Sequence, residues 1–283
     1  LTAGLVAGAF YQLRRETELA QLRADFVSGV SHELRTPLAQ IRMFSETLLL
    51  GRVRDDEERR RSLEIIVNES RRLTHQVDNV LLYSRSERNG MRLATEEAEL
   101  GRLVDEVAEA FAPLALAVES AVEVACSTGC VARVDGALLR QALLNLLDNA
   151  LKYGPRGQTV RLGLEVERTR IRLWVEDEGS GVPAEDRDRI WEPYFRREAH
   201  RESAVAGSGI GLSVVRDVAE AHGGEARVEE GEAGGARFVI ELPAEVLAGI
   251  GPVEGRKARE RIREAAPGTA ASPSPATLRQ ATE

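Results

Sequence analysis

Two stretches of this chain repeat their apolar residues at steps of three and four, the spacing of one face of an α-helix. In the first stretch these residues are Leu19, Leu22, Phe26, Val30, Leu34, Leu38, Ile41, Phe44 and Leu48. In the second, the positions Leu63, Ile66, Ser70, Leu73, Val77 and Val80 keep the heptad spacing of helices that pack lengthwise. The short polar segment 51–58 joins them, so we predict an antiparallel helical hairpin over residues 16–90. Because one hairpin has a narrow core, we expect two copies to form a homodimeric four-helix bundle.

Beyond Asn89-Gly90 the pattern changes to mixed helix and strand. Helices are predicted at 100–111, 138–151 and 210–221, and strands at 161–166, 171–175, 226–228 and 237–242. This order predicts an α/β sandwich over residues 91–244, with one sheet covered by helices, and an α+β fold class for the whole chain. Residues 245–283 drift into Ala, Pro, Ser, Arg and Glu, so we expect a disordered tail there.

The first 15 residues predict a connection to a membrane. Residues 1–11 are apolar, and Arg14 and Arg15 follow them. A bilayer span needs about 20 residues, so we interpret this segment as the cytoplasmic end of a transmembrane helix; an apolar helix start without a membrane is the alternative. The remaining domains are then cytoplasmic. The net charge of −8 argues against a nucleic-acid partner, which would need a basic patch.

The first predicted helix carries a candidate nucleophile within the string FVSGVSHELRTPL at residues 26–38. At about 100° per residue, His32 lies about 200° from both Val30 and Leu34, so we expect an exposed histidine facing away from the buried seam. A neutral imidazole is a competent nitrogen nucleophile at pH 7. Glu33 can take or orient the proton on its other nitrogen, and Thr36 shares its face one turn further on.

Three other residues of the predicted helices have simpler interpretations. Pro37 is expected to bend the first helix just beyond the candidate nucleophile. His75, on the second helix, is interpreted as solvated. His222, before Gly223-Gly224, is interpreted as a structural residue where a helix ends at a glycine.

The predicted helix at 138–151 has a polar face beside its apolar stripe. Asn145, Asn149 and Lys152 recur there at steps of four and three. Two amide oxygens and an ammonium in line can hold a hydrated Mg²⁺ and the phosphates that it bridges. By themselves these residues would also suit an ordinary solvent-exposed face.

Two glycine-rich segments complete the candidate nucleotide site. The strand before DEGSG at 177–181 places Asp177 in phase with core-facing side chains, where it needs a donor such as an adenine amino group. Gly179 and Gly181 let the backbone approach the base. The segment GSGIGL at 207–212 precedes a helix whose first amides can bind phosphate. A dinucleotide fingerprint is excluded, because a loop stands where that motif has a strand.

Taken together, these strings resemble the motifs of bacterial sensor histidine kinases, in the same order. Residues 26–38 are similar to the H box, NLLDNALKY at 145–153 to the N box, and 177–181 to the first glycine box; WEPYFR at 191–196 and 207–212 are similar to the F box and the second glycine box. The resemblance runs from about residue 26 to residue 242. Its departures are mild: Gly154 replaces the usual serine or threonine, and Trp191 the more common phenylalanine.

The resemblance implies an activity. A protein of this kind phosphorylates its own histidine, here His32, from Mg-ATP bound in a gyrase-like domain, and passes the phosphoryl group to an aspartate of a response regulator. Glu33 matches the family's acidic neighbour and Thr36 its phosphatase threonine, which implies that the regulator could also be dephosphorylated.

The same resemblance implies roles around the nucleotide. Asn149, with Asn145, matches the magnesium ligand, Tyr153 lies beside the base, and Arg196 reaches the terminal phosphate. The backbone of the second glycine box would hold phosphate through the segment that contains Gly207, Gly209, Gly211 and Leu212.

Two other functions fit the sequence less well. A gyrase-type or serine-kinase ATPase would have no use for the string around His32. A degenerate kinase that binds nucleotide and signals by shape would require a damaged motif, and the five strings are intact.

Overall fold

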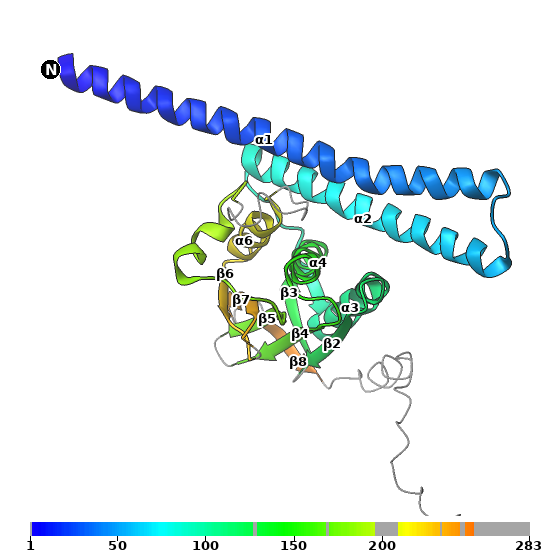
Figure 1. Cartoon of the computed structure of the whole chain (residues 1–283). Helices are drawn as coiled ribbons and strands as arrows, with labels where there is room; N and C mark the ends of the chain where they lie inside the picture. Colours follow the sequence, from blue (N-terminus) through cyan, green and yellow to red (C-terminus); the bar gives the residue numbers. More distant parts are fainter. Residues whose placement is uncertain are drawn as a thin grey trace, which may run out of the picture.

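The computed structural model describes residues 2–126, 129–167, 170–195, 209–232, 234–243 and 247–251. Its first part is a hairpin of two helices, α1 (Thr2–Leu49) and α2 (Asp56–Asn89), as the heptad spacing predicts (Figure 1). Helix α1 continues through Pro37 as one helix, so the proline does not interrupt it. None of the described helices is both long enough and apolar enough to cross a membrane.

The turn of the hairpin is fixed by local hydrogen bonds. The Asp55 carboxylate accepts the backbone N–H of Glu58 at 2.7 Å, and the Glu58 carboxylate accepts the backbone N–H of Arg54 at 2.7 Å. Such reciprocal capping satisfies donors that the first turn of a helix leaves unpaired. Helix α2 therefore begins where the sequence places an acidic cap.

Several large apolar side chains of the hairpin remain exposed in the single chain. They include Val27, Leu38, Met43, Leu63, Val67, Val77 and Leu81. Large apolar side chains that gather on an exposed surface often mark a site of association.

The second part is an α/β sandwich, as predicted. Its helices are α3 (Leu100–Leu116), α4 (Gly136–Tyr153) and α6 (Gly211–Ala221), with the short 3-10 helices η1 (Ala184–Asp186) and η2 (Arg189–Trp191) before α6. The main sheet has the order β2 (Ala121–Cys126), β4 (Thr159–Val166), β5 (Arg170–Glu176), β7 (Ala236–Pro243) and β6 (Glu225–Glu230). A smaller sheet has the order β1 (Glu96–Glu99), β3 (Gly129–Val134) and β8 (Leu247–Gly251).

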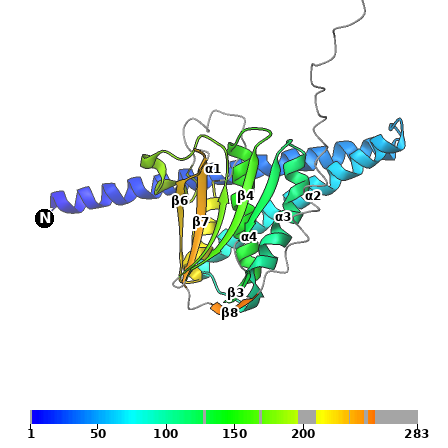
Figure 2. The ribbon, with the colours of Figure 1, turned by 90° about the horizontal axis from the view of Figure 1, so that it is seen from below.

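Helices α3, α4 and α6 lie between the main sheet and the hairpin (Figures 1 and 2). Their apolar stripes meet the inner face of the sheet, where Leu143 and Leu146 of α4 and Leu162 and Leu173 of the strands are fully buried. Each such leucine contributes about 1.5–3 kcal/mol of transfer free energy. This core fixes the rotation of α4, and its polar face consequently points toward the hairpin.

The outer face of the main sheet is built around Trp174. Its indole lies across Gly163 of β4, where a Cβ would stand 2.1 Å from Cε2. The indole N–H donates to the Glu165 carboxylate at 3.0 Å, and the Arg237 guanidinium lies 4.4 Å from the ring centroid. Arginine–glutamate pairs continue along this face, so its charges are largely paired with one another.

His222 is a structural residue, as predicted. It is the C-cap of α6, and Gly223 follows with a φ of +75°. The ring Nδ1 donates to the Val218 carbonyl at 2.8 Å, while Nε2 accepts the backbone N–H of Asp135 at 3.0 Å. The ring thus connects the end of α6 to the start of α4.

The structure corrects the expectation for the first residues of the tail. Residues 247–251, which were expected to be disordered, form β8 and pair with β3, with Ile250 opposite Cys130. The composition of the segment concealed this strand, because its hydrogen-bonding partner lies more than a hundred residues earlier. Strands β1, β2 and β3 were not predicted either. Residues 244–246 and 252–283 lie outside the described residues.

Candidate nucleotide and phosphotransfer site

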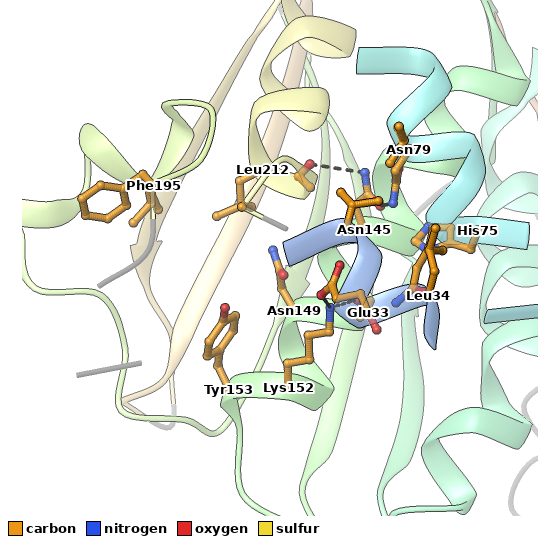
Figure 3. Close-up of a pocket in the computed structure, with 17 residues that line it drawn as sticks. Glu33, Leu34, His75, Asn79, Asn145, Asn149, Lys152, Tyr153, Phe195 and Leu212 are labelled. Carbon is orange, nitrogen blue, oxygen red and sulfur yellow. Dashed lines mark hydrogen bonds and ion pairs between the residues drawn. The ribbon is translucent and has the colours of Figure 1, made fainter. Parts of the chain in front are cut away.

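Helix α4 supplies the centre of the candidate site. It begins at the N-cap Asp135, whose carboxylate accepts the backbone N–H of Leu138 at 3.1 Å. With its leucine stripe buried against the sheet, the helix turns Asn145, Asn149 and Lys152 toward the space below α1 and α2 (Figure 3). The structure therefore brings these three predicted residues together.

The first of two adjoining pockets has the character of a base-binding slot. Six predicted residues line it: Asn149, Tyr153, Asp177, Gly179, Gly181 and Leu212. Its remaining walls are mainly apolar, formed by Val182, Ile190, Phe195 and Phe238. A mostly apolar cleft with one carboxylate suits a flat heterocycle that can donate a hydrogen bond.

Asp177 is held at the bottom of this slot by backbone donors. Only 5% of its surface is exposed, and Oδ1 accepts the N–H groups of Gly179 at 2.8 Å and Ala236 at 3.1 Å. Burial raises the pKa of this carboxyl above its ordinary value, while the two N–H donors act against the rise. The backbone at Gly235 can lie this close to Asp177 only because it lacks a side chain, since a Cβ there would stand 1.9 Å from the Asp177 carbonyl oxygen.

The second pocket lies between α4 and the hairpin and is more polar. It shares Asn149, Tyr153 and Leu212 with the first pocket and is also lined by Lys152, Gly209 and Gly211. From α1 it is lined by Val30, Glu33 and Leu34, the residues on either side of His32 (Figure 3). The hairpin segment that carries the candidate nucleophile thus forms one wall of the same cavity.

Lys152 is the positive charge of this second pocket. Its ammonium lies 2.7 Å from the Asp148 carboxylate and 3.6 Å from Glu33 Oε1. Burial would lower the pKa of Lys152, but these two carboxylates raise it above its ordinary value. Burial would likewise raise the pKa of Asp148, yet the neighbouring ammonium holds it below its ordinary value. Lys152 is therefore charged at neutral pH.

Asn145 uses both ends of its side-chain amide in contacts with other elements. Its Oδ1 accepts the amide N–H of Asn79 on α2 at 2.6 Å, and its Nδ2 donates to the Gly211 carbonyl at 3.2 Å (Figure 3). Asn79 in turn accepts a hydrogen bond from Gln141 at 2.8 Å. This chain of amides connects the hairpin, α4 and the start of α6.

Two further contacts join α2 to the second domain. Ser86 Oγ donates to the Asp217 carboxylate on α6 at 2.8 Å. The rings of Tyr83 and Tyr194 meet edge to face, with centroids 5.7 Å apart. The hairpin is thus docked on α4 and α6 by hydrogen bonds, and on the segment after η2 by an aromatic pair.

Tyr194 and Gly209 stand at the two ends of a segment whose residues 196–208 lie outside the described residues. The Tyr194 N–H donates to the Gly209 carbonyl at 2.9 Å, and both residues have a positive φ, of 68° and 72°. A Cβ on Gly209 would stand 2.9 Å from the Tyr194 Cα, so this approach requires glycine. The predicted site residues Arg196 and Gly207 lie within the segment that is not described.

The predicted phosphotransfer residues have different outcomes. The backbone of His32 is part of α1, and its side chain lies outside the described part of the structure. Thr36 is exposed. Glu33 is buried beside Lys152, and its action on His32 stays a prediction.

The interpretation of His75 as solvated is wrong. Its side chain lines the second pocket, where Nε2 is buried without a hydrogen-bond partner. Sequence reasoning took a polar residue on a heptad helix for a solvent-facing one, because it treated the hairpin in isolation. It missed Asn79 and Asp148 for the same reason.

Comparison with known proteins agrees with this architecture. Residues 22–89 match the His Kinase A phospho-acceptor domain, and residues 134–246 match the family of histidine kinase-, DNA gyrase B- and HSP90-like ATPases. The two matches fall on the hairpin and on most of the α/β sandwich. The chain is therefore built as a phospho-acceptor domain followed by an ATPase domain of the histidine-kinase type.

Curated relatives and solved structures match most of this chain, across both of its domains. The chain is 34% identical over 241 residues to the sensor-like histidine kinase SenX3 of Mycobacterium tuberculosis, covering 84% of this chain and 58% of SenX3. It is 28% identical over 231 residues to the sensor protein SrrB of Staphylococcus aureus, covering 82% of this chain and 40% of SrrB. It thus spans about half the length of these relatives.

Among solved structures, full-length ShkA in complex with AMPPNP matches with a TM-score of 0.54 and 27% identity, over 83% of this chain and 47% of that one. The histidine kinase ThkA in complex with the response regulator TrrA matches with a TM-score of 0.52 and 25% identity, over 81% and 64%. On the motifs, the fold and these likenesses, the chain belongs to the sensor histidine kinases of two-component systems.

Proposed function

We propose that this chain binds Mg-ATP, phosphorylates its own His32, and passes the phosphoryl group to an aspartate of a response regulator. One observation carries the proposal. Val30, Glu33 and Leu34, which surround His32 on α1, line the same cavity as the candidate phosphate-binding residue Lys152. Nucleotide and phospho-acceptor segments therefore meet at one place.

Each part of ATP has a matching part of the site. The Asp177 carboxylate can accept the adenine amino group in the first pocket, where Tyr153 borders the base. Lys152 and the backbone amides around Gly209 and Gly211, which line the second pocket, are proposed to face the γ-phosphate. Arg196 and Gly207 are proposed to join them from the segment between the F box and the second glycine box.

The donor set also fits a magnesium ion. Mg²⁺ prefers oxygen ligands and keeps several waters. Asn149 and Asn145 offer amide oxygens, and among the described residues no cluster of three His, Cys, Asp or Glu competes as a metal site. The ion would neutralise the phosphate charge, and Asn145 would hold it more readily once its Oδ1 no longer accepts the Asn79 N–H.

In the first step an imidazole nitrogen of His32 attacks the γ-phosphorus. The N–P bond forms as the bond to the β,γ-bridging oxygen breaks, and ADP leaves with that electron pair. Glu33 takes the proton from the other ring nitrogen, and Lys152 neutralises charge on the transferring group. Positioning and electrostatics provide most of the acceleration in such a transfer.

The docked arrangement precedes or follows this transfer. Residue 32 lies about 100° around α1 from Glu33 and about 200° from Val30 and Leu34, which face the cavity. Glu33 must also leave Lys152 before it can assist His32. Transfer therefore requires α1 to turn relative to the ATPase domain, or a second chain to present its own histidine.

In the second step an aspartate oxygen of the regulator attacks the phosphohistidine, the O–P bond forms and the N–P bond breaks. The exposed Thr36 can position a water for the reverse reaction, hydrolysis of the phosphoaspartate. The complex of ThkA with a response regulator, seen in a relative, supports this class of partner. The exposed apolar side chains of the hairpin support a homodimer, and the apolar start of α1 supports a connection to a membrane.

Radioactive labelling tests the proposal. The purified chain is incubated with γ-labelled ATP and Mg²⁺ beside His32→Ala and His75→Ala, and the labelled protein is treated with acid and alkali. We expect acid-labile, alkali-stable label on the wild type and on His75→Ala, and none on His32→Ala. Label that persists in His32→Ala would contradict the assignment of the nucleophile. ATP binding without any labelling would instead indicate a nucleotide-gated binding module.

A further inference from the structure

Gly154 directly follows the last residue of α4, and the space beside it is filled by the side chain of Gln158. A Cβ at this position would stand 2.2 Å from Nε2 and 2.3 Å from Oε1 of Gln158. The backbone of Gly154, with φ −84° and ψ 167°, is open to any residue. Glycine is therefore required here by the amide of Gln158, which fills the space that a side chain at 154 would occupy.

Gln158 ties three elements together through its side-chain amide and its backbone carbonyl. Only 2% of the residue is exposed. Its Nε2 donates to the Ala150 carbonyl at the end of α4 at 2.7 Å, and its Oε1 accepts the backbone N–H of Glu178 at 3.1 Å. Its own backbone carbonyl accepts the N–H of Ala121 at the start of β2 at 3.0 Å.

The bond to Glu178 acts on the base pocket, because that N–H belongs to the peptide that follows Asp177. The Asp177 carboxylate is anchored separately by the N–H groups of Gly179 and Ala236. Gln158 thus fixes the backbone of the loop, and the two N–H groups fix the side chain. The same loop lies against the end of α4, since a Cβ on Gly179 would stand 3.2 Å from the Tyr153 carbonyl oxygen.

We propose that Gln158 is a positioning residue for nucleotide-base recognition. It holds the peptide after Asp177 so that this carboxylate meets a base with an exocyclic amino donor, and it replaces the side chain that Gly154 lacks. Gln158 itself need not touch the nucleotide, as it does not line either pocket among the described residues. The proposal deepens the ATP site described above and depends on it.

The first test is the substitution Gln158→Met in the full chain, which keeps the length of the side chain and removes both hydrogen bonds. Calorimetry with ATP and with GTP measures base preference, and labelling kinetics give KM and kcat. Loss of a buried neutral hydrogen bond predicts a dissociation constant for ATP that is about tenfold higher. We expect a smaller ratio of ATP to GTP affinity, a higher KM for ATP, and a kcat at saturating ATP within about twofold of the wild type, because no group near the phosphates has changed.

A double-mutant cycle tests whether the side chain at position 158 fills the space that a side chain at position 154 would otherwise occupy. Gly154→Ser alone forces its Cβ into the Gln158 amide and should weaken ATP binding by a similar factor. Combined with Gln158→Gly, the serine finds the space vacant, and ATP affinity should recover above that of Gly154→Ser alone. If Gln158→Met fails to fold, the difference in ATP affinity between Gly154→Ser and the double variant still tests the role of Gln158.

Val160→Ala is the matched stability control. Val160 is fully buried in β4, two residues from Gln158, and lines neither pocket among the described residues. It should lower the melting temperature without changing the ATP to GTP ratio. The proposal is overturned if Gln158→Met retains wild-type affinity and preference, or if Val160→Ala shifts them equally. A wild type that binds no nucleotide would instead overturn the proposed ATP site itself.

Discussion

The substitution Asn79→Ala tests whether docking of the hairpin controls access to the metal side of the ATP site. Asn79 is 9% exposed, and its amide donates to Asn145 Oδ1 at 2.6 Å. The same Asn145 oxygen is the proposed ligand for Mg²⁺. The Asn79 N–H occupies one of the two lone pairs of this oxygen, so we expect docking and metal coordination to compete.

The magnitude follows from the hydrogen bonds that are lost. In the docked state Asn79→Ala leaves the buried Asn145 oxygen without its donor, which costs about 1–3 kcal/mol, whereas in the undocked state water replaces the donor. The docked state is thereby weakened about 5- to 150-fold relative to the undocked state. If docking of the hairpin limits Mg-ATP binding, the apparent dissociation constant of Asn79→Ala for Mg-ATP should be lower than that of the wild type by up to the same factor.

Calorimetric titration with ATP, in Mg²⁺ and in EDTA, measures the effect. We expect tighter binding of Mg-ATP to Asn79→Ala and a smaller change in EDTA, because only the metal needs the released oxygen. Asn68→Ala, the same substitution three turns earlier on α2, is the control and should match the wild type. Unchanged or weaker Mg-ATP binding by a folded Asn79→Ala protein would refute the competition.

Three further predictions concern stability. Gly163→Ala places a Cβ 2.1 Å from the Trp174 indole; overpacking of this kind costs about 1–3 kcal/mol, which urea unfolding would measure, and a cost below that of an exposed control such as Ala39→Gly would contradict the packing described. Leu146→Ala removes a fully buried leucine of α4 and should cost about 2–5 kcal/mol by the same assay. Burial lowers the pKa of His75; Asp148 and Asp78 act to raise it and Lys152 to lower it. Below about pH 6.5, His75 is protonated in the unfolded chain but still neutral in the folded chain. The free energy of unfolding should therefore fall as the pH drops below that value. Melting curves should show a smaller loss for His75→Gln, and an equal loss would exclude His75 as the cause.

Sequence reasoning succeeded where the signal is local. The heptad spacing predicted the hairpin, and the strand alternation before Asp177 predicted a buried carboxylate. Both depend on residues within a few positions of one another, which periodicity can detect.

It failed where partners are distant in the chain. Asn79 and Asn145 are 66 residues apart, and each by itself is an ordinary polar residue on a helix. Gln158 had no feature that marked it, although the unusual glycine at 154 was a signal that some other side chain fills its place. Strand β8 and the burial of His75 depend equally on partners that only the folded chain brings near.

The uninterrupted helix α1 has a mechanical consequence. At 1.5 Å per residue, its 48 residues form a rod about 72 Å long. A helix transmits torsion along its axis through the hydrogen bonds of each turn, so a rotation imposed near Thr2 would reach the turn of His32 without a joint to absorb it. That turn forms one wall of the nucleotide cavity, so a small twist at one end of the rod could change which side chains face ATP.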